Sequence, residues 1–211
     1  AVMMCLITSQ VSKRWLFQQK ENAALHPQQR SPIPHKQLLI FGVIILIGFT
    51  VDSAISTWSS IYLKDILASS ATVAPLGYAA YQMGILLTRL SLDYLLKFKS
   101  AAWVAFITTL IGATGCAIAG LGHSLAIVIA GFALAGVAVG ALVPLTFSAA
   151  GGLDENRRDE IIARVNIFNY GGAVAGAVIV GLLAAPIGYG PSFIGLALAL
   201  LSVIYFRKRF I

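Results

Sequence analysis

Charged residues and cysteines are scarce in this sequence. Asp, Glu, Lys and Arg make up 11% of its 211 residues and hydrophobic residues 58%, whereas a soluble domain has about 25% charged and 45 to 50% apolar residues. A soluble fold of this length could not cover so much apolar surface, so we expect the chain to lie in a lipid bilayer. The two cysteines, Cys5 and Cys116, stand in separate apolar segments without CxxC or Cys/His spacing. Neither a disulfide framework nor a metal site is predicted.

Catalytic and nucleotide-binding motifs are absent as well. The sequence has no HExxH, GxSxG, GxxxxGK[ST] or dinucleotide-binding fingerprint. Its histidines, His26, His35 and His123, fall between apolar segments, not on one helical face beside acidic residues. We therefore predict that the chain is not an enzyme and holds no cofactor or metal. A separate ATPase subunit is an alternative that the sequence leaves open.

Six long apolar segments dominate the rest of the chain, and each is bounded by a polar or Gly/Pro break. A membrane-spanning helix needs about 20 predominantly apolar residues. The connections are too short for a soluble domain, and lipid offers no hydrogen-bond partner to the backbone, so each segment must be a helix. We predict an all-α polytopic membrane protein. Its six transmembrane helices are expected at 38–63, 72–96, 101–120, 124–149, 161–185 and 190–206.

The first 36 residues do not fit that pattern. Residues 1–11 are apolar but about half a span long, and residues 12–36 are polar, basic and contain proline. A signal peptide carries its positive charges before the apolar stretch, not after it. We expect residues 1–11 to be the end of a preceding membrane helix, residues 12–36 a linker, and residues 37–209 the six-helix domain.

Basic residues predict the orientation in the membrane. Thirteen of the fifteen Lys and Arg residues precede the first span or follow the second, fourth and sixth. Lys64 lies on the other side and Arg89 within a span. Because basic loops stay in the cytoplasm, we expect the linker and the C-terminus on the cytoplasmic side of an inner or plasma membrane. This bias explains the net charge of +7 and gives no reason to invoke nucleic acid.

Asp52 is the most unusual residue, because it lies near the centre of the first apolar span. A carboxylate there costs about 2.5 to 3.5 kcal/mol on insertion scales. The cost falls if the side chain faces a water-filled cavity or takes up a proton. We therefore predict that Asp52 is a proton-coupling site. The alternative is a structural partner for a Lys, Arg or Ser on a neighbouring helix.

Other polar and aromatic side chains inside the spans are candidates for lining a solute cavity. Ser56 shares a helical face with Asp52, although serine hydroxyls commonly bond to their own helix. Asparagines can equally join helices, and tryptophan is common at membrane interfaces. The cavity candidates are Ser56, Trp58, Gln82, Asn166, Asn169 and Tyr170.

A second group of residues points to gating or helix packing. Arg89 and Asp93 are four residues apart and can pair on one helix, with Lys97 one turn further on. Two GxxxG motifs predict close helix contacts, and Pro144 predicts a bend in the fourth span. The packing candidates are Gly136, Gly140, Pro144, Gly172 and Gly176.

Three of these segments share their pattern with one transporter family. The first span ends in D-x5-W-S-x2-Y-L, the fourth contains G-x3-G-x3-P-L-x-F-S-A-A-G, and the fifth contains Y-x-G-x3-G-x4-G. Over residues 37–209 the chain resembles the C-terminal half of a major facilitator superfamily transporter, in its sugar-permease-like and uncharacterised inner-membrane-protein branch. Relatives often have Gly-Pro-Pro where this chain has Gly176-Ala177-Val178. The family's cytoplasmic signature GxxxDRxGRR is reduced here to RLSLDYLLKFK, in which Asp93 and Lys97 match its acidic and one basic position.

The resemblance implies two three-helix inverted repeats, with a solute bound near the midplane and moved by alternating access. The expected partners are a small solute, protons, the lipid bilayer and an N-terminal half of the same polypeptide. Residues 1–36 then correspond to the end of that half and the cytoplasmic linker. Two alternatives stay open, namely a complete six-span transporter or channel subunit of another family, and a membrane structural or assembly protein. The solute and the direction of transport are not predicted.

Overall fold

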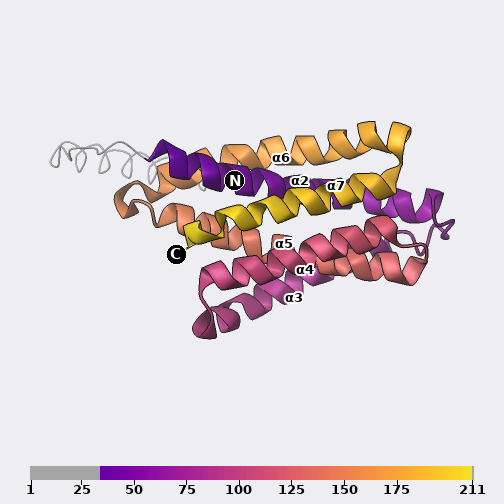
Figure 1. Ribbon diagram of the computed structural model, residues 1–211, viewed down its shortest axis with the longest axis horizontal. Helices are drawn as coiled ribbons and strands as arrows, with labels where there is room; N and C mark the ends of the chain where they lie inside the picture. The colour runs from indigo at the N-terminus through magenta and orange to yellow at the C-terminus, as the bar shows by residue number, and fades with distance from the viewer. Residues whose placement is uncertain (1–33, 211) are drawn as a thin grey trace, which may run out of the picture. The chain divides into compact units, whose positions relative to one another are not determined.

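A computed structural model describes residues 34–210, and these residues form a bundle of helices (Figure 1). The predictions for residues 1–33 lie outside the described residues. No strand occurs between residues 34 and 210, so the all-α prediction is confirmed. The long helices are α2 (His35–Asp65), α3 (Leu76–Phe98), α4 (Ala101–Leu121), α5 (Leu125–Gly151), α6 (Arg158–Ile187) and α7 (Tyr189–Val203). Short 3-10 helices, η1 (Glu155–Arg157) and η2 (Ile204–Phe210), precede α6 and follow α7.

The helix ends follow the local sequence. Pro75 immediately precedes α3, where its fixed φ and missing N–H are compatible with a helix start. Ser100 precedes α4 and accepts a hydrogen bond from the Trp103 N–H at 3.3 Å. Gly188 separates α6 from α7 with φ of 88°, a conformation that favours glycine. α5 runs through Pro144 without interruption.

Five of the six predicted spans form helices that are long and apolar enough to cross a membrane. The exception is α3, which has 23 residues but contains Gln82, Arg89, Asp93 and Lys97. It begins at Leu76, four residues after the predicted start, because Ser70–Pro75 forms a turn instead. α3 therefore differs from its neighbours in polarity, not in its ability to form a helix of membrane length.

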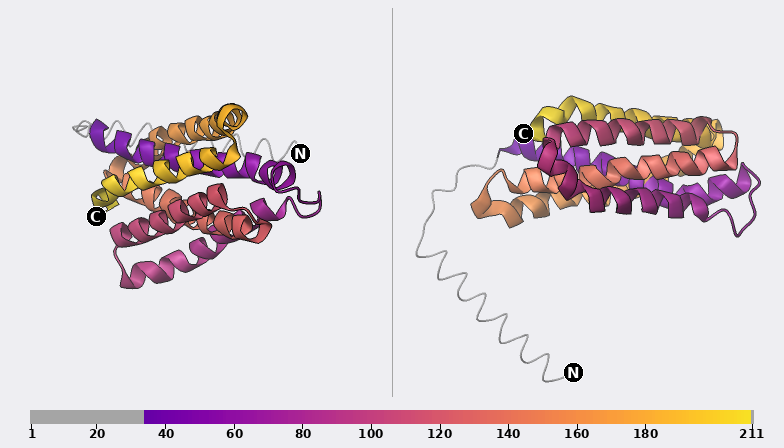
Figure 2. Two further views of the ribbon diagram at one scale, coloured as in Figure 1. Left: turned by 45° about the vertical axis from the view of Figure 1, so that its right-hand side comes forward. Right: turned by 90° about the horizontal axis from the view of Figure 1, so that it is seen from below.

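The long helices pack in a reciprocal pattern. α2 packs chiefly on α6, and α3 packs chiefly on α5, while α4 lies between α5 and α7 (Figures 1 and 2). The first helix of each consecutive set of three thus packs on the middle helix of the other set. Each set of three helices therefore contributes its first helix to a close pair with the other set.

Glycines allow both of these helix pairs to approach closely. On α6, Gly172 faces the carbonyl of Leu46 and Gly176 faces that of Thr50, both on α2. On α5, Gly136 faces the Tyr81 carbonyl of α3. A Cβ at any of these glycines would collide with backbone, so small residues are required there. Both GxxxG motifs therefore lie at helix interfaces, since Gly140 also contacts α3 at Ile85.

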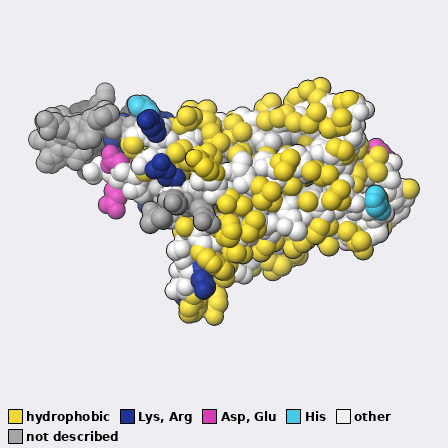
Figure 3. Space-filling model, in the orientation of Figure 1, with side chains coloured by type: hydrophobic (Ala, Val, Ile, Leu, Met, Phe, Trp, Pro, Cys, Tyr) yellow, Lys and Arg dark blue, Asp and Glu magenta, His cyan; other side chains and the backbone are white. Residues whose placement is uncertain are grey.

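The ends of the bundle differ in charge. Within the described chain, Lys and Arg gather at the end where α2 begins and α7 finishes, on the left of Figure 3, while hydrophobic side chains cover the middle. At that end Glu160 forms ion pairs with Arg157 at 2.9 Å and with Arg164 at 2.6 Å. Lys64 lies at the opposite end, in the last turn of α2. This distribution agrees with the basic bias read from the sequence.

Candidate functional site

Asp52 lies in the middle part of α2 and is half-buried. Its Oδ1 accepts a hydrogen bond from the Tyr81 hydroxyl on α3 at 2.8 Å. The ion pairs among the described side chains are those of Glu160, so none of them neutralises Asp52. The alternative prediction of a Lys or Arg partner is therefore not met within the described side chains.

Tyr81 is a partner of Asp52 that the sequence did not single out, because the two residues belong to different spans. Its side chain is 0% exposed. It belongs to the buried face of α3, which is formed by Gly77, Tyr81, Gly84, Ile85, Thr88 and Leu92. A buried tyrosine hydroxyl needs a hydrogen-bond partner, so a tyrosine on this face, where Thr88 is the other polar side chain, was the signal that could have identified it.

Two side chains of α2 bond directly to the backbone of α6. Ser53 Oγ donates to the Ala173 carbonyl at 2.5 Å, and Trp58 Nε1 donates to the Ala177 carbonyl at 2.9 Å. Gly176 lies between these carbonyls and contacts Ser53. The bonds and the glycine together fix α2 against α6, and so they fix the position of Asp52.

The remaining candidates on α2 have structural partners. Ser56 is exposed, and its hydroxyl donates to the Asp52 carbonyl at 2.8 Å, as expected of a serine that bonds to its own helix. The Trp58 ring lies 5.8 Å from that of Tyr189. Tyr189 forms an aromatic cluster with Tyr62 at the Lys64 end of the bundle. Trp58 therefore contributes both to aromatic packing near the membrane interface and to the α2–α6 contact.

The polar candidates on α3 and α6 do not hydrogen-bond to Asp52 within the described structure. Gln82 is exposed. Asn169 Nδ2 donates to Asn166 Oδ1 at 3.3 Å on α6, and the Tyr170 side chain is 67% exposed. These groups stay predictions as cavity residues; Gln82 and Tyr170 are exposed, and Asn166 and Asn169 are half-buried.

Arg89 and Asp93, whose spacing allows an ion pair on one helix, do not pair in this structure. Both side chains are exposed, and they form no ion pair with each other. Lys97 is also exposed near the end of α3. All three residues remain gating candidates without an intrahelical pair.

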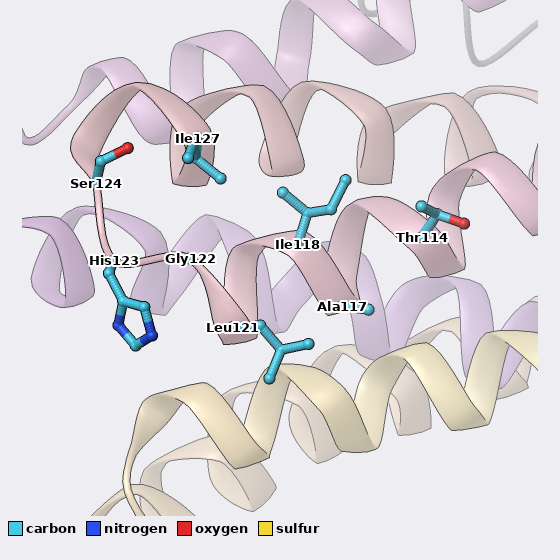
Figure 4. A pocket seen from close by; sticks show the side chains of 8 residues that line it. All are labelled: Thr114, Ala117, Ile118, Leu121, Gly122, His123, Ser124 and Ile127. Carbon is cyan, nitrogen blue, oxygen red and sulfur yellow. The ribbon is translucent and has the colours of Figure 1, made fainter.

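Two hollows in the described bundle lie away from Asp52. One, of about 460 Å³, is formed by the ends of α4 and α5 and their connection (Figure 4). The other, of about 400 Å³, lies at the ends of α2 and α4, beside the connection between α6 and α7. Neither hollow contains a predicted site residue. The first is lined by Thr114, Ala117, Ile118, Leu121, Gly122, His123, Ser124 and Ile127.

Replacing Trp58 by Phe tests the α2–α6 contact. The variant keeps an aromatic ring but loses the bond to the Ala177 carbonyl, so we expect a loss of about 0.5 to 1.5 kcal/mol from the missing hydrogen bond. Thermal unfolding in detergent should show a lower Tm. Trp103→Phe is the matched control, because Trp103 is 43% exposed and contacts Lys99 through its ring face. Equal Tm values for the two variants would contradict the assignment.

The chain has relatives among bacterial membrane proteins, although no protein-family model matches it. It is 33% identical over 174 residues to an uncharacterised transporter of Sinorhizobium fredii, a match that covers 82% of the chain and 46% of the relative. It is 28% identical over 204 residues to the membrane protein MosC of Rhizobium meliloti, covering 93% of the chain and 50% of the relative.

A third relative names the superfamily in its own description. It is an uncharacterised MFS-type transporter of Yersinia pestis, 28% identical over 171 residues that cover 81% of the chain and 44% of the relative. The chain thus spans about half the length of the curated relatives it matches. These relatives confirm the family resemblance that the sequence motifs predicted.

Proposed function

We propose that this chain, a homologue of major facilitator superfamily transporters, acts as the C-terminal half of a secondary active transporter. The transporter moves a small solute by alternating access and couples that movement to protons at Asp52. An N-terminal half of the same polypeptide supplies the other wall of the solute pathway. The relatives' names support membrane transport, and proton coupling is the step that we add.

The distribution of polar side chains supports a solute pathway on one set of helices. Charged and amide side chains within the long helices belong only to α2, α3 and α6, and α4, α5 and α7 have none. Exposed polar groups at membrane depth must face water or protein, because lipid cannot satisfy them. Exposed polar side chains in the middle of α2, α3 and α6, such as Gln82, therefore face the solute pathway or the other half of the protein.

The single observation that carries the proposal is the environment of Asp52. Its carboxylate is half-buried at membrane depth and is held by one phenol, with no cation paired to it among the described side chains. A carboxylate of this kind can exchange a proton when the pathway opens to water on either side. A structural carboxylate would instead be expected to form a closed ion pair.

The orientation follows from the charged ends of the bundle. The end that carries Lys36, Lys97, Arg158 and Arg164 lies in the cytoplasm, in accordance with the positive-inside rule. The linker and the C-terminus are then cytoplasmic, and the Lys64 end faces the opposite side of the plasma membrane.

Solute-dependent proton movement tests the proposed function across several classes of solute. The full-length protein is reconstituted in liposomes that contain a pH-sensitive dye, and sugars, amino acids and organic acids are added one at a time. A proton-coupled transporter changes the internal pH for one chemical class, and this change is absent from protein-free liposomes. Solute flux without proton movement would reject the coupling, and the absence of both across the panel would favour a structural or assembly role.

A further inference from the structure

We infer that Tyr81 is the positioning residue for Asp52, and that their hydrogen bond joins two helix pairs most strongly while Asp52 is ionised. This inference deepens the proposed function and rests on it. Tyr81 holds the carboxylate in one orientation in the ionised state. Protonation of Asp52 then weakens the bond and releases α3 from α2.

The bond lies between two close helix pairs of the bundle. α2 and α6 form one close pair through Gly172 and Gly176, and α3 and α5 form another through Gly136. Between α2 and α3, the hydrogen bond from Tyr81 to Asp52 is the one side-chain bond in the described structure. The carboxylate therefore acts at the contact between two pairs that are each held firmly by backbone packing.

Close packing restrains Tyr81, the donor of this bond. Tyr81 is 0% exposed, and Gly136 lies directly against its backbone carbonyl. Its ring lies 6.5 Å from that of Tyr78, one turn earlier on α3. The hydroxyl cannot follow a moving carboxylate without a shift of the helix, so a change at Asp52 is transmitted to α3.

Few other titratable groups lie near the Asp52–Tyr81 pair in the described structure. Tyr78 on α3 and Cys116 on α4 are the other titratable groups in electrostatic reach of Tyr81. α5 has no titratable side chain, and on α6 the titratable residue beyond the basic end is Tyr170. A hydrogen bond to an ionised group is roughly twice as strong as one between neutral groups. The protonation state of Asp52 therefore controls the strength of this bond.

Infrared spectroscopy of the full-length protein in lipid tests the positioning role without any solute. Asp52→Asn identifies the carboxylate stretching band of Asp52 by its loss. Tyr81→Phe should shift that band, because the carboxylate loses its phenol donor, while the aromatic ring still fills the buried site. Tyr78→Phe is the matched control and should leave the band in place. An unshifted band in Tyr81→Phe would overturn the inference.

Spin-label distances between the basic ends of α2 and α3 test the transmission step. Labels are attached to cysteines introduced at Lys36 and Phe98, which are exposed. The native cysteines of the full-length protein are replaced. We expect the wild-type distance distribution to change between neutral and acidic pH, and Tyr81→Phe to show one distribution at both. A wild-type pH response in Tyr81→Phe would overturn the inference.

The two tests separate this inference from the proposed function. Both measure the Asp52–Tyr81 pair without solute or a pH gradient. If Asp52→Asn retains proton-driven flux while Tyr81→Phe shifts the carboxylate band and removes the distance change, the proposed function fails and the positioning role stands. If flux depends on Asp52 but neither spectrum responds to Tyr81→Phe, the inference fails and the proposed function stands.

Discussion

Asp52→Asn is expected to abolish proton-driven solute uptake into proteoliposomes. Asparagine has nearly the shape of aspartate and can still accept a hydrogen bond from Tyr81, but it cannot bind and release a proton. Solute exchange that needs no driving force should persist, because it requires the helices to move but no net proton transfer. The measurement compares initial uptake under an imposed pH gradient with counterflow at equal pH on both sides.

Asp65→Asn is the matched control for this prediction. Asp65 is the last residue of the same helix and is exposed, so its substitution removes one carboxylate from α2 without affecting the interior site. We expect wild-type uptake from this variant. Loss of counterflow in Asp52→Asn would instead indicate a structural role for Asp52, and retained gradient-driven uptake would remove it from the coupling mechanism.

Gly176→Ala should destabilise the protein more than an alanine at any other glycine of α6 or α7. The new Cβ would collide with the Thr50 carbonyl and approach the Ala54 nitrogen on α2. Because both are backbone atoms, the two helices must separate. Overpacking of this kind costs about 1 to 3 kcal/mol, and the separation also weakens the Ser53 and Trp58 bonds to α6.

Gly195→Ala provides the contrast within the same bundle. Nothing lies within 4 Å of a Cβ at Gly195 in α7, so the variant should be neutral, or more stable by up to about 1 kcal/mol through helix propensity. The free energy of unfolding, followed for both variants by tryptophan fluorescence in mild detergent, is the relevant quantity. Equal stability of Gly176→Ala and wild type would contradict the close α2–α6 contact.

The helices were predictable from sequence because hydropathy and helix geometry leave little choice at membrane depth. Both GxxxG motifs were correctly read as packing sites, since glycine spacing is visible in one dimension. The partners of Asp52 were not predictable in this way, because Tyr81 is 29 residues away in the chain and helix pairing brings them together. The spacing of Arg89 and Asp93 showed that the two side chains can pair on one helix, but spacing alone does not decide whether they do.

Steady-state solute accumulation as a function of the imposed pH gradient is the most direct test of proton coupling at Asp52. Once the solute is known, full-length wild-type and Asp52→Asn proteins are compared in the same liposomes over a series of gradients. We expect accumulation by the wild type to rise with the gradient, while Asp52→Asn only equilibrates the solute at every gradient. Accumulation by Asp52→Asn that rises as steeply as that of the wild type would contradict proton coupling at Asp52.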